Sequence, residues 1–366
     1  MTKAEELYRL GQSVWLDNIN RRLILSGGLE RMIETGLSGL TSNPSIFEKA
    51  ISAGADYDPL ITELNRRGSS AFEIYDELTL ADVRDAADAF LEVFRRRQGR
   101  DGFVSLEINP KLAHDVEETV KEGKRLFGRL NRPNCMLKVP ATESGFKAIE
   151  ELVSYGVNVN VTLIFSLAQY IGAAEAYIKG INRFIKNKGD AGRVHSVASV
   201  FVSRLDTAVD SLLEGLGKPH LKGRAATSNC ALIYKKSLEI FSSSSFKSLK
   251  DRGVNPQRVL WASTSTKNPD YSDTKYVTEL IARDTVNTLP EPTFQAFLDH
   301  GKVKEALTGE VSWAESHIAA LSEAGIDINQ ECVRLQQEGI AAFEKAFDLI
   351  LSTVETKIRS SAEVGS

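Results

Sequence analysis

The chain has 366 residues, of which 42% are hydrophobic, and its formal net charge at pH 7 is -4. This size supports one large or two medium globular cores rather than a small disulfide-dependent scaffold. Because the balance is slightly acidic and both signs of charge are interspersed, nucleic acid is an improbable partner.

The cysteines and the apolar segments predict a cytoplasmic protein that does not associate with a membrane. Cys135, Cys230 and Cys332 are far apart and form no CxxC pair, a pattern typical of reduced thiols. No stretch approaches the roughly 18 apolar residues of a membrane span, and residues 1–7 form a charged helical pattern rather than a signal peptide. Neither the cysteines nor the histidines are spaced as metal ligands, so no metal is expected.

Short segments rich in β-branched and apolar residues recur along the chain, each followed by a polar turn and a helical pattern. The predicted strands cover residues 13–19, 36–43, 103–109, 135–141, 157–164, 196–202, 258–265 and 286–289. Eight strands that alternate with helices favour a (β/α)8 TIM barrel. An open doubly wound sheet is the alternative, but such a sheet usually has a Gly-rich first turn, and neither GxGxxG nor GxxxxGK(S/T) occurs.

A barrel of this kind needs about 250 residues, so about 100 remain for extra helices. Segments 44–97 and 205–255 are too long for single crossover helices, and the sequence after residue 290 is mainly helical. We predict that residues 1–366 form one domain with helices inserted and added at both termini. Segments 186–192 and 242–245 have the composition of exposed loops.

Two helices show apolar stripes at helical spacing. After the third strand, Leu112, Val116, Val120 and Phe127 are spaced to face the sheet. In the last helix a stripe runs through Ile340, Phe343, Phe347, Ile350, Val354 and Ile358, which predicts a packing role.

Lys138 places a single ammonium group inside the apolar segment 135–141, just before a turn toward a helix. Burial there favours the neutral amine, which can attack a carbonyl and form a Schiff base. The alternative is that the alkyl stem lies along the sheet while the ammonium extends to solvent.

Polar residues occur at the C-terminal ends of nearly all predicted strands, where an α/β barrel has its active site. In chain order they are Asp17, Thr41, Ser42, Asn43, Glu107, Asn109, Lys138, Asn158, Asn160, Thr162, Ser199, Ser203, Arg204 and residues 263–267. Asn158, Asn160 and Thr162 alternate with valines and therefore share one face of their strand.

Most of these residues also have a purely structural interpretation. Asp17 could cap the next helix, Asn43 could be a turn residue before Pro44, and Arg204 could form a surface pair with Asp206. Glu107 could be the ion-pair partner of a lysine, which is compatible with catalysis. The joint pattern is stronger than any member, because an amine, two carboxylates and several hydroxyl and amide groups follow successive strands.

These residues lie in six ordered motifs: WLDN at 15–18, GLTSNPS at 39–45, VSLE at 104–107, LKVPAT at 137–142, NVTLIFS at 160–166 and SVFVSR at 199–204. Through them the chain resembles the transaldolases, in the branch of standalone bacterial enzymes, over nearly its whole length. The resemblance implies a class I aldolase barrel without a cofactor. It would transfer a dihydroxyacetone unit from sedoheptulose 7-phosphate or fructose 6-phosphate to glyceraldehyde 3-phosphate or erythrose 4-phosphate, in the pentose phosphate pathway.

The resemblance also implies a role for each site residue. Lys138 would form the Schiff base, Asp17 would exchange a proton with the hydroxyl beside the scissile carbon, and Glu107 and Thr162 would hold a proton-shuttling water. The substrate-binding residues would be Thr41, Asn43, Asn160, Ser199, Phe201, Arg204, Ser265 and Lys267. The family offers both monomers and homodimers.

The phosphate end departs from the family pattern. The family's Ser-x-Arg-Asn after the seventh strand reads Ser265-Thr266-Lys267-Asn268 here. Lysine supplies a point charge where arginine would supply a fork, so acceptor preference stays open, and Ser263 is an alternative phosphate contact.

Two other functions are compatible with these residues. A fructose 6-phosphate aldolase would use the same barrel and lysine but release free dihydroxyacetone. A non-catalytic sugar-phosphate-binding barrel would need none of the acid–base groups.

Overall fold

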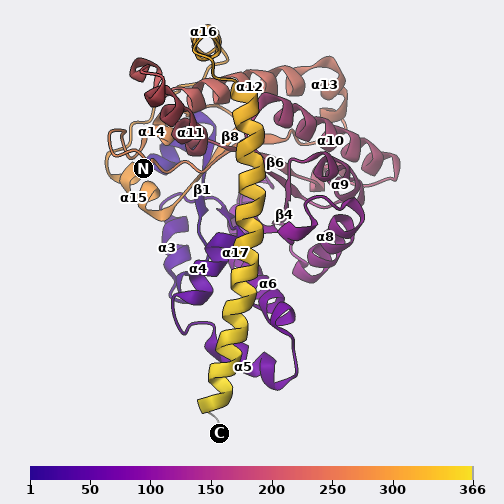
Figure 1. Ribbon diagram of the computed structural model, residues 1–366. Coiled ribbons are helices and arrows are strands. Elements are labelled where there is room, and N and C mark those ends of the chain that lie inside the picture. The colour runs from indigo at the N-terminus through magenta and orange to yellow at the C-terminus, as the bar shows by residue number, and fades with distance from the viewer. Residues whose placement is uncertain (365–366) are drawn as a thin grey trace.

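Eight parallel strands close into a barrel in sequence order in the computed structural model, which describes residues 1–364 and side chains through residue 360 (Figure 1). The strands are β1 (Gln12–Asp17), β2 (Leu40–Thr41), β3 (Val104–Glu107), β4 (Cys135–Pro140), β5 (Val159–Ile164), β6 (Ser196–Phe201), β7 (Arg258–Ala262) and β8 (Thr285–Leu289). The predicted (β/α)8 barrel is therefore confirmed, and each predicted strand overlaps an observed one. Most are shorter than predicted, because flanking residues at one or both ends already belong to loops.

The first half of the chain carries an N-terminal helix and a large insertion between β2 and β3. The elements are α1 (Lys3–Leu10), α2 (Arg21–Leu25), α3 (Gly28–Glu34), α4 (Pro44–Ser52), α5 (Asp58–Arg66), α6 (Ala71–Ala89), α7 (Leu91–Arg96), the 3-10 turn η1 (Pro110–Leu112), α8 (Val116–Leu130) and α9 (Glu143–Tyr155). The prediction that segment 44–97 holds more than one helix is confirmed.

The second half ends in three helices beyond β8. Its elements are α10 (Leu167–Lys186), η2 (Ala191–Arg193), α11 (Ser203–Gly215), η3 (Pro219–Leu221), α12 (Ala225–Ser242), α13 (Ser244–Lys250), α14 (Lys275–Thr278), α15 (Glu291–His300), α16 (Ser312–Glu323) and α17 (Ile328–Val364). The predictions of several helices in segment 205–255 and of a helical C-terminal part are confirmed.

Of the two predicted loops, residues 187–190 form a mostly exposed connection between α10 and η2, as predicted, whereas segment 242–245 is the junction of two helices. Only Ser243 separates α12 from α13, and its hydroxyl accepts the Phe246 amide, so the serine run caps a helix rather than forming a loop. Within 186–192, Lys186 still ends α10 and Ala191 begins η2, which leaves a short connection. Serine-rich composition marks helix caps as well as loops, and the spacing alone did not separate them.

The apolar stripe predicted after the third strand packs against the core, but the most buried face of α8 is rotated slightly from it. The fully buried positions of α8 are Thr119, Gly123, Leu126 and Leu130, whereas the predicted Leu112, Val116, Val120 and Phe127 are only partly buried. The rotation follows from close packing at Gly123, where a Cβ would lie 2.7 Å from Leu152 Cδ2 on α9.

The long helix α17 crosses the molecule, passes over α4 and α6, and ends beside α5 (Figure 1). Its predicted stripe is confirmed, since Ile340, Phe343, Phe347, Ile350 and Val354 are buried and Ile358 is partly buried. Within residues 1–364, none of the helices combines the length and apolar character that a membrane crossing requires.

Candidate active site

Strand register brings the central polar residues side by side. Glu107 on β3 pairs with Lys138 on β4, and Lys138 pairs with Asn160 on β5. On the two strands before β3, Asp17 on β1 pairs with Thr41 on β2. Because paired residues of parallel strands stand side by side, Glu107, Lys138 and Asn160 form one group and Asp17 and Thr41 a second, and the two groups together form the polar layer near the C-terminal end of the barrel.

The Lys138 side chain is buried, with a residue exposure of 4%. Its Nζ donates a hydrogen bond to the carbonyl oxygen of Ser42 at 3.0 Å and lies 3.7 Å from Glu107 Oε2. The alternative in which the ammonium extends to solvent is therefore wrong, and the amine faces the barrel interior.

Glu107 and Thr162 flank this lysine on the neighbouring strands, and both are buried. Burial raises the pKa of Glu107 to about 7, although the positive charge of Lys138 opposes the shift. Among the described residues, neither Glu107 Oε2 nor Thr162 Oγ1 has a hydrogen-bond partner. Each atom therefore has hydrogen-bonding capacity that no described residue uses.

Asp17 is held by a threonine rather than by a helix. Its Oδ1 accepts a hydrogen bond from Thr41 Oγ1 at 2.7 Å, and that hydroxyl also lies 2.7 Å from Thr288 Oγ1. Burial raises the pKa of Asp17, against the effects of Lys138, the Thr41 bond and Arg204. The alternative that Asp17 caps the next helix is wrong, because Asn20 caps α2.

Asn43 combines both interpretations of its sequence position. Its side-chain oxygen accepts the Ile46 amide at 3.0 Å and so caps α4, which begins at Pro44. The same side chain lines the cavity described below. Its amide nitrogen remains available to a ligand.

Asn160 and Ser199 form a buried hydrogen-bonded chain. Asn160 Nδ2 donates to Ser105 Oγ at 3.1 Å, and Ser199 Oγ donates to Asn160 Oδ1 at 2.6 Å. Asn158 has a different role, because its amide donates to the backbone oxygens of Pro133 and Cys135 at the start of β5. Only two of the three alternating polar residues of this strand therefore belong to the polar layer.

A cavity of about 360 Å³ opens above this layer. Nine of the twelve predicted site residues line it, namely Asp17, Thr41, Asn43, Lys138, Ser199, Phe201, Arg204, Ser265 and Lys267. The other three, Glu107, Asn160 and Thr162, are buried in the surrounding wall.

Two cations of the cavity, Arg204 and Lys267, follow β6 and β7. The guanidinium of Arg204 lies over the ring of Phe201, 5.5 Å from its centroid, and Lys267 Nζ donates to Ser265 Oγ at 3.0 Å. A surface pair between Arg204 and Asp206 is wrong, because Asp206 is buried and accepts hydrogen bonds from the Ala226 amide and the Tyr276 hydroxyl. Arg204 therefore faces the cavity.

The family described as Transaldolase/Fructose-6-phosphate aldolase matches residues 14–354 of this chain. The chain belongs to this family. Relatives named transaldolase include those of Saccharopolyspora erythraea, 45% identical over 98% of both chains, and Thiobacillus denitrificans, 42% identical over 97% of this chain and all of the relative. The transaldolase of Neisseria gonorrhoeae is 41% identical over 96% of this chain and 99% of its own length. The resemblance seen in the motifs is thereby confirmed.

This member of the transaldolase/fructose-6-phosphate aldolase family also places residues in the cavity that the motifs did not single out. Ile46 and Lys49 come from α4, and Phe343 comes from α17, where only a packing role was predicted. Lys49 could have been suspected, because it lies within two turns of Asn43 on a helix that begins at the site. Phe343 had no such signal, because it is about 200 residues from Lys138 in sequence.

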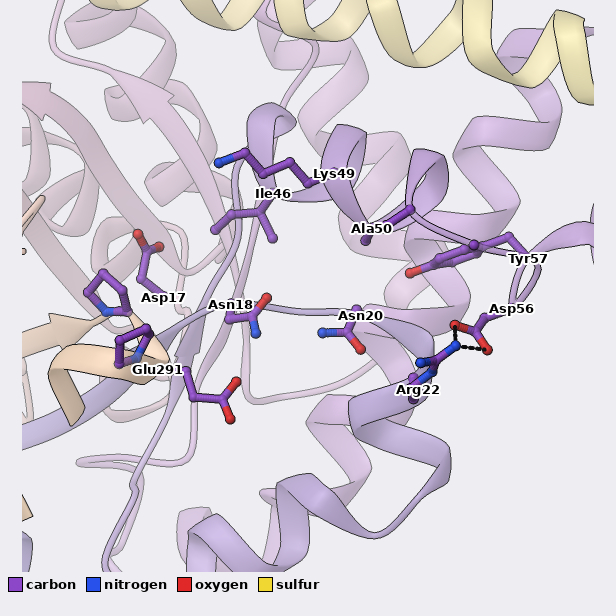
Figure 2. Close-up of a pocket in the computed structure, with 14 residues that line it drawn as sticks. Asp17, Asn18, Asn20, Arg22, Ile46, Lys49, Ala50, Asp56, Tyr57 and Glu291 are labelled. Carbon is purple, nitrogen blue, oxygen red and sulfur yellow. Dashed lines mark hydrogen bonds and ion pairs between the residues drawn. The ribbon is translucent and has the colours of Figure 1, made fainter. Parts of the chain in front are cut away.

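A second cavity, of about 460 Å³, borders the first (Figure 2). The two share Asp17, Ile46, Lys49 and Pro290 as lining residues. Figure 2 shows Asp17 at one end of this second cavity and the Arg22–Asp56 ion pair, 3.2 Å long, at the other. Asp17 therefore lies between two cavities. The second cavity is lined by none of the predicted substrate-binding residues.

Proposed function

We propose that this protein is a transaldolase that moves a dihydroxyacetone unit from sedoheptulose 7-phosphate or fructose 6-phosphate to glyceraldehyde 3-phosphate or erythrose 4-phosphate, in the pentose phosphate pathway. The observation that carries the proposal is the buried Lys138 amine, which lies 3.7 Å from Glu107 at the base of a polar cavity. The full-length similarity to relatives named transaldolase supports the same activity.

In the first step the Lys138 amine attacks the keto carbon of the substrate to give a carbinolamine, which loses water to give an iminium ion. The water that leaves takes the carbonyl oxygen with it, and it needs a proton donor. Glu107 Oε2 and Thr162 Oγ1 are buried without partners, which supports their holding the water that shuttles these protons. A carboxyl with a pKa of about 7 can both donate and accept near neutral pH.

In the second step Asp17 removes the proton from the hydroxyl beside the scissile carbon. The electrons of the carbon–carbon bond move into the iminium, the first aldehyde leaves, and the remaining three-carbon enamine stays attached to Lys138. Attack of the enamine on the acceptor aldehyde reverses these events, and Asp17 returns its proton. The raised pKa of Asp17 suits this exchange.

The remaining cavity residues support the binding of the substrate at its two ends. Asn43 and Ser199 line the cavity near the polar layer and suit the hydroxyls of the dihydroxyacetone unit. Arg204 suits the phosphate because its guanidinium can form two parallel hydrogen bonds, while Ser265 and Lys267 add a hydroxyl and a point charge.

Covalent trapping tests this function. The protein is incubated with fructose 6-phosphate and reduced with sodium borohydride, and the modified peptide is sought by mass spectrometry. We expect the added mass of a reduced three-carbon adduct on Lys138. Failure to gain mass at this lysine would favour the non-catalytic sugar-phosphate-binding barrel.

The second candidate is a fructose 6-phosphate aldolase, an activity that the name of the matched family includes. Analysis of the products with and without erythrose 4-phosphate separates the two. A transaldolase forms sedoheptulose 7-phosphate only when the acceptor is present and releases little free dihydroxyacetone. An aldolase releases dihydroxyacetone in amounts equal to the glyceraldehyde 3-phosphate, whether or not the acceptor is added.

A further inference from the structure

The backbone at the C-terminal end of β5 is irregular directly after Thr162. Leu163 has a φ of 56°, and the pairing of β5 with β6 shifts between Val161 and Ile164. A leucine in the left-handed region costs on the order of 1–2 kcal/mol, so it persists only where neighbouring groups hold it. The helix that supplies those neighbours is α17.

Gln336 of α17 bonds to the ends of two strands at once. Its Nε2 donates to the carbonyl oxygen of Leu163 at 3.0 Å and to that of Ala141 at 2.8 Å. Leu163 follows Thr162 directly, and Ala141 comes three residues after Lys138. One side-chain amide therefore links the strand that carries the lysine to the strand that carries the threonine.

Two further residues on the same face of α17 contact this segment. Cys332, one turn earlier, donates to the Phe165 carbonyl oxygen at 3.3 Å. At Gly339, just under one turn later, a Cβ would lie 2.8 Å from Leu163 Cδ2, so the glycine makes room for the irregular residue. Residues 332, 336 and 339 have the spacing of a single helix face. This face of α17 therefore contacts the irregular end of β5 at three successive positions.

We infer that Gln336 is a positioning residue for the Schiff-base chemistry. The Ala141 amide already donates to the Thr162 carbonyl oxygen at 2.8 Å, and by tying Leu163 to Ala141 as well, Gln336 holds Thr162 at a set distance from Lys138. It thereby sets the place of the water that leaves and enters during carbinolamine formation and breakdown. The inference rests on the proposed function. Gln336 does not line the catalytic cavity, so its effect passes through the backbone of β4 and β5.

Gln336→Met tests this inference, because methionine keeps the length and the helix propensity of the side chain but donates no hydrogen bond. Gln337→Met is the matched control, since this neighbour on the same helix is exposed. The rate of adduct formation is measured by rapid mixing with fructose 6-phosphate and quenching in borohydride. The KM for the acceptor aldehyde and the melting temperature are measured on the same proteins.

We expect Gln336→Met to slow adduct formation by about 10- to 100-fold, as for a displacement of about 1 Å in a catalytic site. The KM for the acceptor should change less than twofold, and Gln337→Met should match the wild type in every measurement. If Gln336→Met fails to fold, Gln336→Asn takes its place, because an amide one methylene shorter cannot reach both carbonyls.

Adduct formation at the wild-type rate in the folded Gln336 variant would overturn the inference. So would a loss confined to the melting temperature, which is the result of a merely structural contact. A wild-type protein that forms no adduct would instead remove the proposed function itself, so the two failures are distinguishable.

Discussion

The barrel interior holds a buried pair of opposite charges at each end, and the two pairs are bonded very differently. At the N-terminal end, Arg258 lies 3.2 Å from Asp101 and also donates to Ser13 Oγ and to the backbone oxygens of Arg100 and Thr285. At the C-terminal end, Lys138 and Glu107 are 3.7 Å apart, and among the described residues Glu107 Oε2 accepts no hydrogen bond.

This difference indicates different roles: Arg258–Asp101 is a structural pair, which stabilises the fold, and Lys138–Glu107 is a chemical pair, which takes part in the proposed reaction. Asp101 is saturated, because Ser13, Trp15, Arg97 and Arg258 all donate to its two oxygens. Such a pair closes the barrel, and its carboxylate has no unused acceptor for a ligand, although Arg258 Nε has no hydrogen-bond partner among the described residues. Lys138 lines the cavity, and Glu107 Oε2 retains unused hydrogen-bonding capacity, which is what a group that must bind and release protons requires.

The largest expected effect tests the chemical pair. Lys138→Ala should lower turnover by at least about 10⁴-fold, because no other described group replaces the nucleophile. The melting temperature should not fall, since an interior lysine costs stability and Glu107, whose pKa is already raised to about 7, can take up a proton once the lysine is removed. Steady-state kinetics and thermal unfolding check both parts, and a variant with wild-type turnover would contradict the mechanism.

The next effect separates the two carboxylates at the C-terminal end. Asp17→Asn should slow carbon–carbon cleavage by about 10²- to 10⁴-fold, the usual contribution of a general base, while adduct formation at Lys138 persists. Borohydride trapping and product release are measured on the same sample. Loss of trapping with retention of cleavage would show that Asp17 has been given the wrong role.

A substitution in the structural pair should lower the stability of the fold but leave the rate of adduct formation nearly unchanged. Arg258→Gln leaves Asp101 buried with part of its positive partner removed, and we expect the free energy of unfolding to fall by about 3–5 kcal/mol. Guanidinium titration gives this value. The folded fraction should still form the Lys138 adduct at nearly the wild-type rate. A loss of adduct formation without a loss of stability would contradict the assignment of a purely structural role to the Arg258–Asp101 pair.

The pH dependence sharpens the comparison further. If Glu107 acts as a carboxylate, adduct formation should fall by about tenfold per pH unit below its pKa of about 7. Because the pKa is raised above its ordinary value of 4.5, this group contributes stability at low pH and loses it as pH rises from 4.5 toward 7. In Glu107→Gln both trends should disappear, as rate and melting-temperature profiles would show.

The smallest effect concerns the exposed cation of the cavity. Lys267→Gln should raise the KM for a phosphorylated acceptor by only about two- to fivefold, because an exposed charge contributes at most about 1 kcal/mol and is screened by salt. Arg204→Gln, at a half-buried guanidinium, should raise it by about 10- to 100-fold. An equal effect of both substitutions on KM would contradict the assignment of Arg204 as the main phosphate contact.

Much of the catalytic layer could be predicted from the sequence because it depends on local rules. Alternation along a strand decides which side chains face inward, and the order of strands in a closed barrel decides which of them are neighbours. Glu107, Lys138 and Asn160 were therefore placed together before any contact was known. Asn158 obeys the same alternation but lies too near the strand start, and only hydrogen-bond partners revealed this.

The chain order and the inward-facing residues of the eight strands were thus contained in the sequence by itself, because strand and helix periodicity are local properties. Only the tertiary structure decided which helices complete the site. Lys49 enters the cavity from α4 and Phe343 from α17, while Gln336 of α17 binds the backbone at the ends of β4 and β5, roughly 200 residues after the lysine. The physical reason is that a helix can pack across a barrel at several angles and offsets, and the choice is made by close contacts such as Gly339 against Leu163, which no spacing rule encodes.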